Sequence, residues 1–299
     1  MTKSKQSSAL LGDYTLTQEE VIFRPLIPFT HGLSYEILVD NQPIAQIEIP
    51  KSPKIPVLLG IYPSQDTLPE NLLKFYLVFS QSMVEGQSLK YIALVNIQGD
   101  TLRHTFLDLQ PELWNKQRTI LTLWIDPGRI KRDLQPNKLL GTPLTHGNQY
   151  QLVISNQWPD EMGATLTKNY TKKFVVAMPD LNRPKVDNWQ IKTPQKNSKK
   201  PLVISLNESL DYILLQNTIE VINNEGNQVE GTISIQEKEK KVYFTPTHPW
   251  IRGAYILQIE SRLEDLAGNN LNRLFDTDIS NRQVEPTDKK VVELKWQIK

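Results

Sequence analysis

The chain of 299 residues carries 34 Lys and Arg against 33 Asp and Glu, which gives a formal net charge of +1 at pH 7. A balance this close excludes the basic field that recruits nucleic acid or an anionic membrane to a whole protein, so we expect no nucleic-acid partner. The chain contains no cysteine, which excludes disulfides, thiolate nucleophiles and cysteine-based metal sites.

Length and residue pattern together indicate two β-sandwich domains and a remainder. An Ig-type sandwich takes about 100 residues, so the chain has room for two somewhat enlarged copies, and the boundaries predicted below leave residues 1–54 over. Hydrophobic residues make up 39% of the chain, and they fall in short alternating runs, which is the pattern of strands. We predict an all-β chain of tandem Ig-like β-sandwiches with an additional N-terminal partial β module.

The first part of the chain, residues 1–54, is the predicted partial module. Its polar start, residues 2–8, is typical of a disordered end. The apolar run 9–11 is shorter than the ~7 to 15 residues of a secretory signal, and no run approaches the ~20 residues of a membrane span. As written, the chain is expected to carry no signal peptide and no transmembrane segment.

One corner pattern occurs three times along the chain. Residues 21–25 (VIFRP), 123–127 (LWIDP) and 242–246 (VYFTP) each end in Pro and are each followed by a Gly. The strand patterns that come next begin at Tyr35, Tyr150 and Tyr255. Each places an aromatic and two aliphatic side chains on one face of a strand, so we interpret each copy as one corner of a sandwich.

The first copy has the second half of this repeat without a first half. Half a sandwich cannot bury both of its faces, so either upstream sequence is missing or the strands of residues 1–54 borrow partners. The alternating segment 292–298 (VELKWQI) is a candidate for a borrowed strand. Closure of the N-terminal module by this C-terminal strand is a hypothesis from patterning alone.

The middle copy belongs to the first complete domain, residues 55–180, and contains an enlarged loop, residues 128–146. Twenty residues separate Pro127 from Gly147, where the other copies use seven. A long loop on a rigid scaffold is a usual place for recognition residues.

This loop contains three basic side chains. Arg129 and Arg132 could each form a forked contact with a carboxylate or phosphate, with Lys131 as a point charge. The alternative is that their stems pack on the domain while their charged ends are solvated or pair with Asp126 and Asp133.

The second complete domain spans residues 184–299, after a short proline-stiffened connection at residues 179–184. Its turn at residues 265–271 (DLAGNNL) is typical of a hairpin, in which Asp caps the turn and Gly accepts a positive φ. Asp265, Asn269 and Asn270 could also hold calcium, but a hairpin turn needs the same side chains for its own hydrogen bonds.

Six Trp residues raise the possibility of sugar binding by exposed indole rings. Trp124, Trp189 and Trp250 lie in or beside strand patterns, where core or interdomain packing is ordinary. Trp114 and Trp158 lie outside strand patterns and are the better candidates for ligand binding.

The residue types of known catalytic sites do not occur here in a recognisable arrangement. The four His residues are scattered, and no carboxylate spacing resembles a general-acid and nucleophile pair. No Ser lies in a Gly-x-Ser-x-Gly sequence. We therefore expect no catalytic residue, no metal and no cofactor.

Residues 75–83 (FYLVFSQSM), together with the Pro, Gly and Tyr steps and the sequence DLAGN at 265–269, resemble the bacterial Ig-like domain family of S-layer and other envelope proteins. The second complete domain departs from the first of these motifs at residues 204–210 (ISLNESL). The resemblance implies a spacer, scaffold or adhesion-type binding protein, generally outside the cytoplasm, and supplies no catalytic residue.

The expected function is therefore that of a non-catalytic Ig-like spacer, scaffold or adhesion protein of the bacterial cell envelope, with a protein or glycan as partner. The expected location is periplasmic, cell-surface or secreted. The alternative is a carbohydrate-binding or accessory module of an envelope enzyme.

Overall fold

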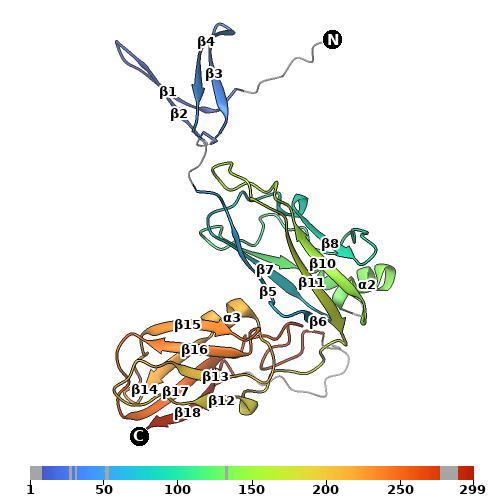
Figure 1. Ribbon diagram of the computed structural model, residues 1–299, viewed down its shortest axis with the longest axis vertical. Coiled ribbons are helices and arrows are strands. Elements are labelled where there is room, and N and C mark those ends of the chain that lie inside the picture. Colours follow the sequence, from blue (N-terminus) through green and yellow to red (C-terminus); the bar gives the residue numbers. More distant parts are fainter. Residues whose placement is uncertain (1–8, 27–28, 31, 51–53, 132–133, 277–288) are drawn as a thin grey trace.

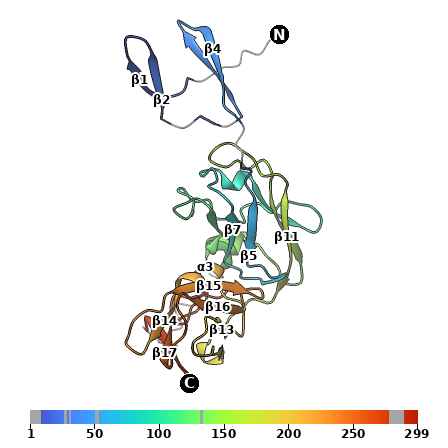
Figure 2. The same ribbon diagram turned by 60° about the vertical axis from the view of Figure 1, so that its left-hand side comes forward.

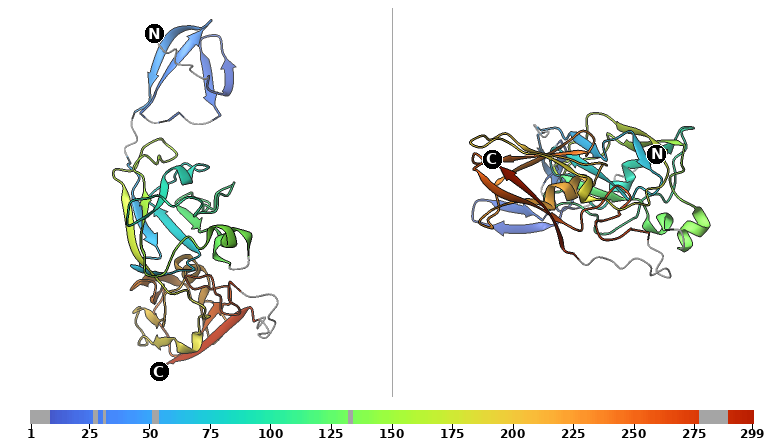
Figure 3. Two further views of the ribbon diagram at one scale, coloured as in Figure 1. Left: turned by 90° about the vertical axis from the view of Figure 1, so that its right-hand side faces the viewer. Right: turned by 90° about the horizontal axis from the view of Figure 1, so that it is seen from below.

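The computed structural model describes residues 9–26, 29–30, 32–50, 54–131, 134–276 and 289–299. It is an all-β protein with a few short helices. Figure 1 shows three bodies along its long axis: the N-terminal strands at one end, a middle domain, and a third domain at the other end. Figure 3 shows the same end-to-end order from a direction at right angles.

The N-terminal module, by which we mean the described residues of 9–50, consists of two separate hairpins (Figure 2). One hairpin is the two-stranded sheet β1-β2, and the other is β3-β4. Their bounds are β1 (Gly12–Leu16), β2 (Val21–Pro25), β3 (Ser34–Val39) and β4 (Gln42–Glu48).

The middle domain is a sandwich of the four-stranded sheet β6-β11-β10-β8 and the three-stranded sheet β5-β7-β9, counted over its described residues. Trp158, Phe75 and Leu77 are fully buried between these sheets. The elements are β5 (Leu58–Tyr62), β6 (Thr67–Pro69), β7 (Lys74–Phe79), η1 (Ser88–Lys90), β8 (Ile92–Asn96), β9 (Ile120–Trp124), α1 (Pro127–Ile130), α2 (Gln135–Leu140), β10 (Gln149–Ile154) and β11 (Tyr170–Ala177). The enlarged loop therefore contains the two short helices α1 and α2.

The third domain repeats this plan with the sheets β12-β13-β16-β15 and β14-β17-β18 over its described residues. Its core contains Trp250, Leu257 and Ile259. The elements are η2 (Val186–Asn188), β12 (Gln190–Lys192), β13 (Leu202–Ser205), α3 (Tyr212–Asn217), β14 (Ile219–Asn223), β15 (Gly231–Gln236), β16 (Lys241–Pro246), β17 (Gly253–Glu260) and β18 (Val291–Ile298).

The C-terminal strand completes the third domain. β18 pairs with β17 along its whole length, from Gly253 opposite Ile298 to Glu260 opposite Val291. The hypothesis that this strand closes the N-terminal module is therefore wrong. The reason is local, because the adjacent edge of β17 accepts β18 and the Trp296 ring stacks on Tyr255 at 4.7 Å.

A hydrogen bond recurs at the three predicted corners. At each corner a backbone N–H donates to the hydroxyl of the Tyr in the strand that follows, and this tie fixes the loop against its own strand. The pairs are Thr30 with Tyr35 at 2.9 Å, Thr145 with Tyr150 at 3.2 Å and Ile251 with Tyr255 at 3.3 Å. Within the described ranges, no helix has the length and apolarity to cross a membrane.

Candidate functional site

The most elaborate arrangement of polar side chains lies where the middle and third domains meet, which we call the junction (Figure 1). The middle domain contributes side chains from β5 and β7 and from the turn after β5. The third domain contributes the start of α3, the turn before β16 and the turn after β17. The residues that define the junction are Tyr62, Ser64, Lys74, Tyr76, Asp211, Tyr212, Glu239, Glu264 and Leu266.

Lys74 is the central cation of the junction. Its Nζ lies 2.9 Å from Oδ2 of Asp211 and 2.8 Å from Oε2 of Glu264, and its side chain is only 10% exposed. Burial alone would lower the pKa of the amine, but the charges of Asp211 and Glu264 outweigh that effect and the pKa is raised. The ammonium is therefore charged, and it depends on carboxylates from the other domain.

Asp211 owes its position to its own helix. Its Oδ1 accepts hydrogen bonds from the backbone N–H groups of Ile213 and Leu214, which makes it the N-cap of α3. Its Oδ2 accepts a 2.7 Å hydrogen bond from the Tyr76 hydroxyl. Burial and the charge of Asp211 raise the pKa of Tyr76, so the phenol remains a neutral donor. The third domain thus positions the Asp211 carboxylate, and Tyr76 and Lys74 of the middle domain contact it.

Close packing surrounds this ion pair. The rings of Tyr62 and Tyr212 stack with their centroids 3.5 Å apart and their planes 6° from parallel. Leu266 of the third domain packs into the core of the middle domain, and its carbonyl accepts a 2.9 Å hydrogen bond from the N–H of Leu73. A Cβ added to Gly268, which has a φ of +82°, would overlap the side chain of Leu73.

The turn before β16 makes a second polar contact. Glu239 is 2% exposed, and its Oε2 accepts a 2.9 Å hydrogen bond from the N–H of Ser64. Burial raises the pKa of Glu239. At the rim of this contact, Lys238 and Asp66 form an exposed ion pair at 2.7 Å.

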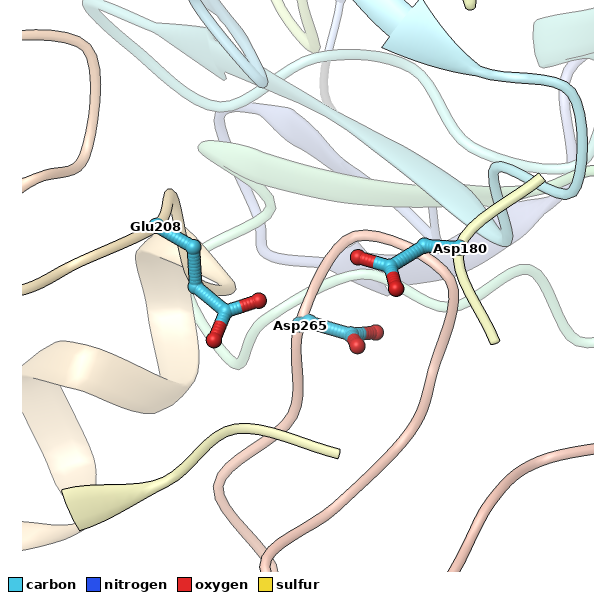
Figure 4. A group of neighbouring side chains, drawn as sticks. All are labelled: Asp180, Glu208 and Asp265. Carbon is cyan, nitrogen blue, oxygen red and sulfur yellow. The ribbon is translucent and has the colours of Figure 1, made fainter. Parts of the chain in front are cut away.

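Beside the junction lies a group of three acidic side chains, Asp180, Glu208 and Asp265, whose oxygens come within 4.8 Å of one another (Figure 4). Burial, and in addition the charge of Asp180, raise the pKa of Asp265 to about 8. The same Asp265 accepts hydrogen bonds from the N–H groups of Ala267 and Asn269, as its hairpin turn requires.

These three carboxylates could each supply one oxygen to a cation. Calcium takes roughly 6 to 8 oxygens. The nearby carbonyls of Asp180 and Asn182 already accept hydrogen bonds from the side chain of Asn269. The polar groups at this place thus already form hydrogen bonds within the turn and between the turn and the connection that joins the domains.

Two of the basic residues predicted as a contact surface are described by the structure, Arg129 in α1 and Lys131 directly after it. Arg129 is 7% exposed, and its guanidinium donates to the carbonyls of His104, Leu140 and Gly141 at 3.0 to 3.2 Å. These donors hold the enlarged loop together. Lys131 lies with its Nζ 4.6 Å from the centre of the Phe275 ring. Arg132 is outside the described residues.

The two Trp residues predicted as sugar-stacking candidates lie close to each other in the middle domain, with ring centroids 5.9 Å apart. Trp158 is 0% exposed and packs edge-on against Phe79 at 5.2 Å, so neither face of its indole reaches solvent. Trp114 is half-buried, and its indole N–H donates to Glu112 at 2.8 Å.

The junction residues were not predicted from the sequence. Lys74 stands directly before the apolar run 75–79, and Asp211 stands directly before a short helical segment, a typical N-cap position. The sequence shows both of these local features, but neither feature indicates which residue of the other domain Lys74 or Asp211 contacts. Lys74 and Glu264 are 190 residues apart in the chain.

No family model matches the chain, and no curated protein sequence matches it. Solved structures with detectable similarity include Escherichia coli alpha-2-macroglobulin domains MG0-NIE-MG1, at 10% identity and a TM-score of 0.27 over 83% of this chain and 91% of that chain. The S-layer protein rSbsC has 10% identity and a TM-score of 0.29 over 69% of this chain and 23% of its own. The Ig1-2 module of Drosophila receptor protein tyrosine phosphatase DLAR has 13% identity and a TM-score of 0.23 over 71% and 93%. Similarity at this level carries no argument about function.

Proposed function

We propose that this chain is a non-catalytic spacer or scaffold in which the junction holds two Ig-like sandwiches in one fixed orientation. The observation that carries the proposal is the pairing of Lys74 with Asp211 and Glu264 across the domain boundary. A buried charge without its partner costs several kcal/mol, so a small rotation that separates Lys74 from Asp211 without admitting water is opposed. Relative motion of domains is restricted where their interface is large and apolar, and here Leu266 and the stacked rings of Tyr62 and Tyr212 add apolar packing to the ion pair.

The connection between the domains supports the same proposal. The backbone N–H of Asp180 donates to the side chain of Asn71 in the middle domain, and Asn71 donates back to the Asp180 carbonyl, both at 2.8 Å. Arg183 donates to the carbonyl of Asn272 in the third domain at 2.6 Å. Both ends of the connection are thus tied to a domain.

The proposed setting is the bacterial cell envelope. It rests on the resemblance of residues 75–83 and 265–269 to the Ig-like family of envelope proteins. A spacer in that setting would keep its two ends a set distance apart, and whatever it contacts would be protein or glycan.

The spacer role is tested by a distance measurement. The chain has no cysteine, so spin labels can be placed at single new cysteines replacing Ile97 in the middle domain and Ile251 in the third, which are 64% and 57% exposed. Double electron–electron resonance should give one narrow distance distribution, and Lys74→Ala should broaden it.

The matched control is Lys238→Ala, which removes the exposed ion pair with Asp66 at the rim of the same interface. Exposed pairs contribute at most about 1 kcal/mol, so this variant should keep the narrow distribution. A broad distribution in the unsubstituted chain would defeat the proposal.

A further inference from the structure

The turn after β17 in the third domain has a counterpart in the middle domain, the turn after β10. Asp265 begins the first turn and Asp160 the second, and Oδ1 of each accepts hydrogen bonds from the backbone N–H groups two and four residues later. Each Asp also forms a β-bridge with an apolar residue of the opposite segment, Leu210 for Asp265 and Met83 for Asp160. Asp265 is 1% exposed and Asp160 is 0% exposed. The two sandwiches therefore place one buried Asp at the same position.

The residue that faces this Asp differs between the two domains. Two residues before the bridge stands Gln81 in the middle domain and Glu208 in the third domain. The side-chain amide of Gln81 donates to Oδ2 of Asp160 and to the carbonyl of Lys54, in the segment that enters the middle domain. At the matching position an oxygen of Glu208 comes within 4.8 Å of an oxygen of Asp265. A second carboxyl group thus stands where the middle domain has a hydrogen-bond donor.

A third carboxyl group, that of Asp180 in the connection between the domains, lies within the same distance of the other two (Figure 4). Carboxyl groups that lie this close and are shielded from water share a proton more readily than they all ionise, because their like charges repel. Burial, and in addition the charge of Asp180, raise the pKa of Glu208, as they do the pKa of Asp265.

The other charged groups of the described segments around this cluster do not replace the proton. Lys240 opposes the raised pKa of Glu208, but its effect is smaller than that of burial. Arg183 of the connection donates to a backbone carbonyl of the third domain, and Glu264, next to Asp265, belongs to the ion pair at the junction. The middle domain meets this place with two uncharged residues, Asn71 and Leu73.

The same turn attaches the connection to the third domain. The side-chain amide of Asn269 donates to the carbonyls of Asp180 and Asn182, and also to Oδ2 of Asp265. The Asp265 carboxyl group therefore orients the amide that binds the connection. A negative charge on Asp265 repels a carboxylate of Asp180, so the protonation of the cluster and the attachment of the connection depend on each other.

We propose that Asp180, Glu208 and Asp265 hold a proton in common, and that the loss of this proton at alkaline pH loosens the connection from the third domain. The shared proton takes the place that the Gln81 amide hydrogen has in the middle domain. The turn is thus a pH-sensitive joint. This inference does not rest on the spacer proposal, because Lys74 contacts a different set of carboxylates.

Thermal melting against pH, in the presence of EDTA, tests the shared proton. Glu208→Gln gives the third domain the residue that the middle domain has, at nearly unchanged size, so the variant should fold. The melting temperature of the unsubstituted chain should fall between pH 5 and pH 9. In Glu208→Gln this fall should be smaller by at least ~2 °C. Glu220→Gln, at an exposed position of β14, is the matched control and should keep the full effect of pH.

Gln81→Glu is the reciprocal change in the middle domain. It places a second carboxyl group beside Asp160 and removes the amide donor. The melting temperature of this variant should fall more steeply with pH than that of the unsubstituted chain. A fall that is unchanged both in Glu208→Gln and in Gln81→Glu would overturn the proposal, because carboxyl groups paired at this position would then not retain a proton.

Hydrogen exchange of residues 180–183 tests the joint itself. The protection factor, which is corrected for the intrinsic effect of pH on exchange, should fall at least ~3-fold between pH 6 and pH 9 in the unsubstituted chain and should change less in Glu208→Gln. Protection that is independent of pH would contradict a loosened connection. Calcium that raises the melting temperature of the unsubstituted chain at pH 9 without EDTA, and has no effect on Glu208→Gln, would also overturn the proposal, because the carboxylates would then hold a cation in place of a proton.

Discussion

The ammonium of Lys74, in the first position of β7, lies 2.9 Å from the carboxylate of Asp211, the N-cap of α3 in the next domain. This ion pair links the middle domain to the third domain, from the start of β7 to the start of α3. Because the Asp211 side chain is 2% exposed, water cannot replace Lys74 if the domains separate slightly. The pair therefore favours one relative orientation of the domains over a range of them.

Lys74→Ala should destabilise the chain by about 3 to 5 kcal/mol, because it leaves Asp211 and Glu264 without their cation. Denaturant unfolding followed by Trp fluorescence measures this change. Lys238→Ala serves as the control at the exposed rim and should cost less than about 1 kcal/mol. Equal effects of the two substitutions would show that Lys74 contributes no more than a surface ion pair.

Gly268→Ala should destabilise the chain more than Gly226→Ala. Both glycines have a φ of +82°, but a methyl group on Gly226 would have no atom within 4 Å, whereas a methyl group on Gly268 would meet Leu73. The strained backbone costs each variant about 1 to 2 kcal/mol. The overlap at Gly268 should add a further ~1 to 3 kcal/mol, measured by denaturant unfolding. If the two variants had the same denaturation midpoint, the domains would not pack as closely at Gly268 as described.

The stability of the chain should fall as the pH is raised from about 4 to 8. Burial raises the pKa of Asp265 to about 8, while the unfolded carboxyl titrates near ~3.9. The folded state therefore holds this proton more tightly, and the stabilisation that results is complete below the unfolded pKa and is lost as the pH rises through 8.

A thermal-melting series against pH measures this effect, with Asp180→Asn as the comparison. Asn keeps the oxygen that accepts the Asn182 N–H and removes the charge that raises the pKa of Asp265. The slope of melting temperature against pH should become shallower in this variant. A slope that stays the same would mean that Asp180 does not influence the titration.

Arg129→Ala should loosen the enlarged loop, residues 128–146, instead of merely removing a surface charge. The substitution leaves several backbone carbonyls without a donor, which should cost about 2 to 4 kcal/mol and expose the loop to limited proteolysis. Lys131→Ala removes a contact with the Phe275 ring and should cost less than about 1 kcal/mol. Cleavage in the loop that is equally slow in both variants would refute the structural role of Arg129.

The parts of the fold that depend on local pattern were predictable. The corners at Tyr35, Tyr150 and Tyr255 carry the expected turn and strand sequences, and each has the same hydrogen bond. The partner of β18 was not predictable, because alternation determines which face of a strand is buried and says nothing about which strand lies beside it.

The junction could not be predicted from the sequence for the same reason. Lys74 meets a side chain 190 residues away, and no local pattern encodes that distance. Trp158 was predicted as a candidate for ligand binding because it lies outside the strand patterns. It is buried because the rings of Phe79, Tyr91 and Trp114, from three other segments of the middle domain, pack against it.

The central claim is that the middle and third domains move as one body, and residual dipolar couplings of the backbone N–H groups test it directly. Couplings from residues 54–179 and from residues 184–276 should fit one common alignment tensor in magnitude and orientation. Two tensors of different magnitude would show that the domains reorient independently, and would contradict a rigid connection at the junction.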